Sequence, residues 1–243
     1  MRILKCNIAE LKILLKLRYD RTYNQALAYE ATDDWEEDEA DWVIDFPKDM
    51  LEDYQKKEYP RLSIDDVEYM MTGSLFYRKL IKNNGLMLHS SAVVVDDYAY
   101  LFSANSGTGK STHTGLWLEY FQDRAYILND DKPAVRNIDG QWYAFGTPWS
   151  GKHDISVNEK VKLGAIVFLE RSEVNWIRSA QIQESIKLFF AQTTRKLYLE
   201  ENMDRLLKVL EAVITENPMY IMGCNISNDA VLMAYETIRR DKI

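Results

Sequence analysis

Residues 104–111, Ala-Asn-Ser-Gly-Thr-Gly-Lys-Ser, have the composition and spacing of a loop that binds phosphate groups. The loop lies between a predicted strand and a predicted helix, where Gly107 and Gly109 let successive backbone N–H groups converge on phosphate oxygens. Lys110 would reach the β- and γ-phosphates as a point charge, and the Ser111 hydroxyl would ligate Mg²⁺. The pattern predicts a site for ATP and Mg²⁺, with nucleotide contacts from Ser106, Gly107, Thr108, Gly109, Lys110, Ser111 and Thr112.

Two adjacent carboxylates follow the short apolar strand expected at 126–128 and lie in the turn 129–133, Asn-Asp-Asp-Lys-Pro. A carboxylate at the end of a strand beside a phosphate loop is where nucleotide enzymes hold their metal. Side chains alternate along an extended chain, so Asp130 and Asp131 should point in different directions. One can then ligate Mg²⁺ while the other acts as a base toward an acceptor hydroxyl. Without the loop, the segment would be interpreted as an Asp- and Pro-containing turn.

Other polar residues are candidates for supporting roles. The loop 146–153, Gly-Thr-Pro-Trp-Ser-Gly-Lys-His, could close over a phosphate or recognise the acceptor, or it could be a plain surface connection. Lys152 is the candidate for stabilising charge on the transferring group, and Arg195 is a second candidate. His89 alone would be interpreted as a core or turn residue. His113, one turn into the helix after the phosphate loop, is expected to be solvated or to act as a cap.

The elements that must position these residues alternate between strands and helices. Strand pairs at 86–95 with 98–103 and at 134–138 with 141–145 are separated by Asp-Asp and Asp-Gly, which predicts two hairpins. Apolar residues at helical spacing after a Ser-x-x-Asp cap predict an amphipathic helix. The alternation predicts a mixed sheet with flanking helices. Helices are expected at 63–83, 110–121, 181–192, 202–216 and from Ser227, with further strands at 163–169 and 219–224.

Residues 1 to about 60 are irregular in composition. The acid-rich segment 33–42, Asp-Asp-Trp-Glu-Glu-Asp-Glu-Ala-Asp-Trp, is their main feature. Like charges at this density repel one another and favour a solvated loop, with an acidic docking site as the alternative.

His89, the first hairpin, the loop SGTGKS and the pair Asp130-Asp131 resemble, in this order and spacing, the C-terminal catalytic domain of HPr kinase/phosphorylase. The loop is also similar to that of phosphoenolpyruvate carboxykinase, which reads SGTGK. The resemblance covers roughly residues 86–240 and is specific in its motifs between 88 and 133. It implies an α/β P-loop kinase fold in which Asp130 is the base, Asp131 helps to hold the metal and His89 lies near the phosphates.

The sequence departs from that family in ways that leave the acceptor open. Ala104 stands where the loop pattern has a glycine, and no basic, glycine-rich segment for docking HPr is found. Residues 1–85 do not resemble the N-terminal domain of the family. We therefore expect two parts: an N-terminal region, 1–85, that recognises substrate or packs against the sheet, and a P-loop kinase domain, 86–243.

Composition limits the partners. Acidic residues outnumber basic ones 38 to 30, for a formal net charge of -8, so a broad surface for nucleic acid is not expected. Cys6 and Cys224 are too few for a disulfide scaffold or a cysteine zinc site. Charged residues interrupt every apolar run, so neither a signal peptide nor a membrane span is expected, and we expect a cytoplasmic location.

The sequence thus predicts an enzyme, an ATP-dependent kinase that moves the γ-phosphoryl group to a serine-like hydroxyl of a peptide, protein or small molecule. Two alternatives stay open: a nucleotide-dependent binding or switch module, and phosphorolysis or ATP hydrolysis on the same scaffold. The oligomeric state is open as well, and a homo-oligomer is compatible with the sequence.

Overall fold

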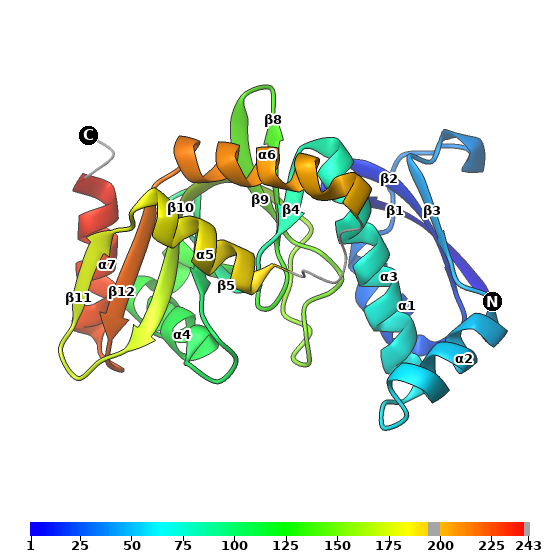
Figure 1. Ribbon diagram of the computed structural model, residues 1–243, viewed down its shortest axis with the longest axis horizontal. Helices are drawn as coiled ribbons and strands as arrows, with labels where there is room; N and C mark the ends of the chain where they lie inside the picture. The colour runs from blue at the N-terminus through cyan, green and yellow to red at the C-terminus, as the bar shows by residue number, and fades with distance from the viewer. Residues whose placement is uncertain (194–199, 241–243) are drawn as a thin grey trace.

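The computed structural model describes residues 1–193 and 200–240 and places them in two β-sheets with helices around them (Figure 1). The smaller sheet has three strands and the larger sheet has nine. In Figure 1 the smaller sheet lies at the blue, N-terminal end of the molecule, with helix α3 (Ile64–Leu80) between it and the larger sheet. The fold is mixed α/β, as the sequence predicted.

The smaller sheet is formed within the segment of irregular composition. Strands β1 (Arg2–Ile8) and β2 (Leu11–Leu17) form an antiparallel hairpin, and β3 (Trp42–Asp45) pairs in parallel with β2. The hairpin turn is Ala9-Glu10, with φ of 52° and 57°, a conformation that residues other than Gly, Asn and Asp seldom adopt. The sequence did not indicate this hairpin, because its turn lacks the residues that mark one.

The acid-rich segment 33–42 is anchored to this hairpin. Glu39 pairs with Lys12 at 3.3 Å and Glu37 pairs with Lys16 at 3.8 Å, while Trp35 is buried. The segment's carboxylates stay exposed to solvent, as expected for a solvated loop. Its position is nevertheless fixed by the buried tryptophan and the lysines beneath it.

Helices α1 (Asp20–Ala26) and α2 (Lys48–Glu58) pack against α3. The predicted cap of α3 is confirmed: the Ser63 hydroxyl accepts a hydrogen bond from the backbone N–H of Asp66 at 3.0 Å. Short 3-10 turns are η1 (Leu27–Tyr29), η2 (Glu37–Glu39), η3 (Ile81–Asn83) and η4 (Gln122–Arg124).

The larger sheet contains both predicted hairpins and a long central strand, but the strand predicted at 86–95 is interrupted at residues 88 and 89. The hairpins are β5 (Ser90–Val95) with β6 (Tyr98–Ser103) and β8 (Ala134–Ile138) with β9 (Gln141–Phe145). Strand β10 (Lys160–Arg171) pairs in parallel with β6 and β12 and antiparallel with β9, so the sheet is mixed. The other strands are β4 (Gly85–Met87), β7 (Ala125–Asn129), β11 (Trp176–Ser179) and β12 (Met219–Cys224).

Helices cover both faces of the larger sheet. On one face, α4 (Lys110–Phe121) and α7 (Asn228–Arg240) bury a core with Phe102 and Val167. On the other face, α5 (Ile182–Gln192) and α6 (Glu200–Glu216) pack over Leu101 and Ile166. Neighbouring residues of one strand, such as Leu101 and Phe102, belong to different cores because successive side chains of a strand point to opposite faces of the sheet.

A third core joins the two sheets. It includes Leu4 and Tyr77 from the N-terminal region together with Ala134, Phe145 and Trp149 from the larger sheet and its loops. The division into 1–85 and 86–243 therefore stays a prediction. Within the described residues, no helix has both the length and the apolar character that a membrane span requires.

Candidate functional site

The loop 104–109 connects the end of β6 to the first residue of α4, as the sequence predicted. Gly107 and Gly109 have φ of 78° and 118°, which L side chains rarely adopt. A Cβ atom built on either glycine would meet no heavy atom within 4 Å. Ala104, in place of the usual glycine, is buried. The loop therefore faces open space at the N-terminus of a twelve-residue helix, an arrangement that favours anions.

Lys110, the first residue of α4, is buried, with its side chain turned back into the loop. Its Nζ donates to the carbonyl oxygen of Ala104 at 3.0 Å. Burial lowers the pKa of Lys110, and the charges of Asp131 and Asp130 act in the opposite direction. Among the described residues, the Lys110 ammonium has a neutral hydrogen-bond acceptor and carboxylates at longer range, so it can pair with an anion. Ser106, Ser111 and Thr112 are exposed.

Two residues that the sequence did not single out hold the outside of the loop. Arg171, the last residue of β10, donates from Nη2 to the Gly107 carbonyl at 2.5 Å and from Nε to the Thr108 carbonyl at 3.3 Å. Gln192, the last residue of α5, donates to the Asn105 side chain at 2.9 Å. Neither residue belongs to a sequence motif. The fold brings the end of β10 and the end of α5 to the loop, and these contacts cannot be inferred from the sequence around each residue.

The predicted acid pair follows β7, beside the link between β4 and β5 that carries His89. Asp130 accepts a hydrogen bond from the Ser91 hydroxyl at 2.5 Å, and Ser91 is in turn 2.8 Å from the hydroxyl of Thr114 in α4. The described residues include no cation in an ion pair with Asp130. Asp130 is thus tied to the helix that begins with Lys110.

Asp131 is held by two basic side chains. Its Oδ1 lies 3.2 Å from Nε2 of His89, and its Oδ2 pairs with Lys132. Desolvation by burial raises the pKa of Asp131, but hydrogen bonds from His89 and Lys132 and the charges of these residues outweigh it and lower the pKa to about 2. Asp131 is therefore ionised at neutral pH.

The backbone around these acids is fixed by Asn129 and by the first residue of β5, since the Ser90 N–H donates to the Asp131 carbonyl at 3.2 Å. The buried Asn129 side chain accepts hydrogen bonds from the N–H groups of Asp131 and Lys132 at 3.0 and 2.7 Å. The His89 carbonyl accepts from Ser103 at 2.8 Å, at the end of β6 where the phosphate loop begins. The structure thus brings His89, the acid pair and the phosphate loop together, which the sequence resemblance implied.

The loop 146–153 approaches the acid pair through Gly151. A Cβ atom on Gly151 would lie 3.1 Å from the Cβ of Asp131, and the φ of Gly151 is 85°. Lys152 follows it on an exposed turn. Arg195 lies outside the described residues.

The expectation for His113 was wrong. The ring is 3% exposed, accepts a hydrogen bond from Trp117 Nε1 at Nε2 (3.1 Å), and has Nδ1 3.9 Å from the Cys224 sulfur. Desolvation lowers the pKa of His113 to about 4, so the ring is neutral at pH 7. His113 is therefore a core residue on the face of α4 that packs against the sheet. The prediction failed because a residue's position along a helix does not show which face of the helix is buried.

Comparison with known proteins gives a weak structural match. No family model matches this chain, and no curated protein matches it in sequence. Among solved structures, the HPr(Ser) kinase/phosphatase from Coxiella burnetii matches over 64% of this chain and 89% of that chain, with 14% identity and a TM-score of 0.36. The site is therefore interpreted from its own residues.

Proposed function

We propose that the chain is an ATP- and Mg²⁺-dependent phosphotransferase that moves the γ-phosphoryl group of ATP to a hydroxyl. The observation that supports this most is the position of Lys110. It is a buried cation at a helix N-terminus, next to two glycines with open space around them and within the electrostatic influence of Asp130 and Asp131. This set of residues combines a phosphate cradle with carboxylates that can serve the transfer.

The cradle would bind ATP through residues 106–112. Backbone N–H groups of the loop and the first turn of α4 would bind the phosphates, and Lys110 would leave the Ala104 carbonyl for a phosphate oxygen. This exchange is favourable because the lysine then pairs with an oppositely charged oxygen instead of a neutral carbonyl oxygen.

Mg²⁺ would be held by the ionised carboxylate of Asp131 and the exposed hydroxyl of Ser111, where it would neutralise charge on the phosphates. No cluster of three or more His, Cys, Asp or Glu among the described residues could hold a metal by itself. Two oxygen ligands suit Mg²⁺, because this ion commonly takes its other ligands from phosphates and water.

Asp130 is the proposed base. It has no cationic partner among the residues described, whereas His89 and Lys132 keep Asp131 a weak base. The acceptor oxygen would attack the γ-phosphorus as the bond to the β,γ-bridging oxygen breaks, and the acceptor proton would pass to Asp130. The products are a phosphate ester and ADP. His89 would position Asp131, and Lys152 would stabilise charge on the transferring group.

We further propose that residues 86–243 are a P-loop kinase domain and that residues 1–85 help to recognise the acceptor. The third core supports a joint role, since it places α3 directly against the loop that carries Gly151.

The test compares Asp130→Asn with Asp123→Asn, an exposed carboxylate in η4. Each protein is incubated with [γ-³²P]ATP, Mg²⁺ and cell extract, and label is measured in acceptors and in free phosphate. We expect Asp130→Asn to lower transfer roughly 10²- to 10⁴-fold with little change in ATP affinity, because the base acts in the transition state. Asp123→Asn should match the wild type. Equal transfer by Asp130→Asn would remove Asp130 from the mechanism, and label found only in free phosphate would identify an ATPase.

A further inference from the structure

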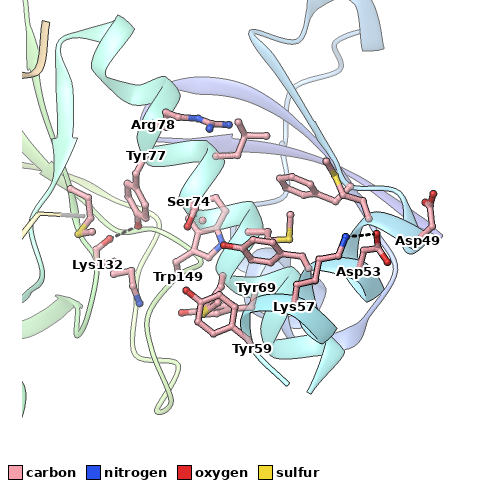
Figure 2. Close-up of a pocket in the computed structure, with 18 residues that line it drawn as sticks. Asp49, Asp53, Lys57, Tyr59, Tyr69, Ser74, Tyr77, Arg78, Lys132 and Trp149 are labelled. Carbon is pink, nitrogen blue, oxygen red and sulfur yellow. Dashed lines mark hydrogen bonds and ion pairs between the residues drawn. The ribbon is translucent and has the colours of Figure 1, made fainter. Parts of the chain in front are cut away.

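A large groove lies between α2 and α3, and the proposed transfer steps do not involve it (Figure 2). Its volume is about 990 Å³, at the upper end of the range for ligand pockets. The residues that α2 contributes recur at helical spacing and form one face of that helix. These are Asp49, Met50, Asp53, Tyr54 and Lys57.

The groove is lined mainly by apolar and aromatic side chains that no other part of the described chain covers completely. Met50 and Tyr54 are 51% and 37% exposed, and Met70, Met71 and Leu75 of α3 are partly exposed. Methionine side chains are flexible and polarizable, so they adapt to apolar groups of different shapes. A hollow apolar surface of this kind is typical of a binding site rather than of an ordinary protein surface.

The inner end of the groove borders the acid pair. Lys132 lines the groove and pairs with Asp131. Tyr69, another lining residue, accepts a hydrogen bond at its hydroxyl from the N–H of Gly151 at 2.9 Å, and Gly151 lies against Asp131. Figure 2 shows Tyr77 bonded to the Lys132 carbonyl at this same end. Among the residues that these contacts involve, only Lys132 and Gly151 thus separate the inner end of the groove from Asp131.

Charged side chains of both signs line the groove. Among the residues drawn in Figure 2, Lys57 pairs with Asp53 at 3.2 Å, whereas Asp49 on α2 and Arg78 on α3 are in no ion pair. Because Arg78 is in no ion pair within the described part of the chain, its guanidinium is available to a carboxylate on the occupant.

We propose that this groove binds a peptide segment of the phosphoryl acceptor, in which a serine or threonine is flanked by a large apolar residue and an acidic residue. This proposal rests on the proposed function. The apolar side chain would enter the groove between Met50, Tyr54 and Met70, the acid would pair with Arg78, and the hydroxyl would lie at the acid pair. A peptide suits the groove because the groove is larger than a single small hydroxyl compound. The groove wall also has separate apolar and cationic residues that different side chains of a peptide can contact.

The first experiment uses the full chain and a degenerate peptide library with one fixed central serine. The immobilised protein is incubated with the library without ATP, and retained peptides are sequenced. In parallel, transfer from [γ-³²P]ATP with Mg²⁺ is measured for the same library and for free serine and glycerol. We expect retained and phosphorylated peptides to share enrichment of large apolar and acidic residues near the serine.

Variants then test the groove itself. Met50→Asp and Tyr54→Ser change exposed residues and should fold, which circular dichroism checks; Leu207→Asp, at a 48% exposed position on α6, is the matched control. For a selected peptide, we expect the two groove variants to raise KM roughly 10- to 100-fold with kcat changed less than about threefold, because they alter binding and not the reacting groups. Arg78→Gln should remove the preference for the acidic residue. The control should match the wild type.

The two proposals can fail separately. Transfer to peptides with unchanged KM in both groove variants, or transfer only to the small hydroxyl compounds, would overturn the groove proposal and leave the kinase standing. Retention of peptides that the groove variants lose, without transfer to any acceptor, would support the groove and contradict the kinase. No selective retention and no transfer would overturn both.

Discussion

Two loops that contain glycine meet at the candidate site, and their glycines serve opposite purposes. In the loop 104–111, the space that a side chain would take at Gly107 or Gly109 is open. In the loop 146–153, a Cβ on Gly146 would lie 1.8 Å from the Val157 carbonyl oxygen, and one on Gly151 would meet Asp131. The first loop leaves room for a ligand, whereas the second leaves room for the protein's own chain.

The difference teaches that a glycine-rich segment indicates a binding loop only when the surroundings of its glycines are known. Both loops looked suitable for phosphate in the sequence. In the structure, the second loop packs against the segment that follows it and against Asp131, so its main role is to fix the acid pair. Substitutions in the loop 146–153 should therefore mainly lower stability, and substitutions in the loop 104–111 should mainly weaken nucleotide binding.

Gly146→Ala should have the largest effect on stability. Its methyl group would collide with the backbone of Val157, which cannot move freely because its N–H donates to the Leu128 carbonyl at 3.0 Å. We expect a loss of roughly 3 kcal/mol or more in the free energy of unfolding, measured by urea denaturation. A loss below about 1 kcal/mol would show that the second loop is not packed as described.

The helix that follows the first loop gives a pH-dependent test. The folded pKa of His113, about 4, lies below its ordinary value of 6.5, so the unfolded chain binds the proton first as the pH falls. Stability from the neutral ring is complete above pH 6.5 and should fall by up to about 3 kcal/mol toward pH 4.

His113→Gln should flatten the dependence of the unfolding free energy on pH across this range. His153→Gln changes an exposed ring and should leave the dependence as it is. If the unfolding free energy of His113→Gln depends on pH as steeply as that of the wild type, His113 is not a buried neutral histidine in the folded protein.

Gly109→Ala should have the smallest effect on stability and a large one on binding. The methyl group meets no atom, so the cost is the strain of φ at 118°, on the order of 1–2 kcal/mol. ATP affinity should nevertheless fall at least about tenfold, because relief of the strain turns the loop N–H groups away from the phosphates. Unfolding and ATP titrations on the same sample measure both, and an unchanged affinity would contradict the phosphate cradle.

The parts of the fold that the sequence revealed are those with local signals. The two hairpins of the larger sheet have Asp-Asp and Asp-Gly turns, and α3 has its Ser63 cap. The β1–β2 hairpin was missed because Ala9-Glu10 carries no turn signal.

The same distinction holds for the site. The phosphate loop and the acid pair are short contiguous motifs, so the sequence indicated them. Arg171 and the groove were missed because strands and helices distant in the sequence assemble them. Tertiary contacts of this kind leave no periodic or spacing pattern that a single sequence can show.

Calorimetric titration of ATP with Mg²⁺ into the wild type and Lys110→Met tests the central claim most directly. The account predicts saturable binding at one site in the wild type and an affinity at least about 100-fold lower in the variant, since the buried cation provides the main charge for the phosphates. The free energy of unfolding should stay the same or rise, because the variant no longer buries a charge. Equal affinity of both proteins, or no saturable heat with any nucleoside triphosphate and Mg²⁺, would contradict the account.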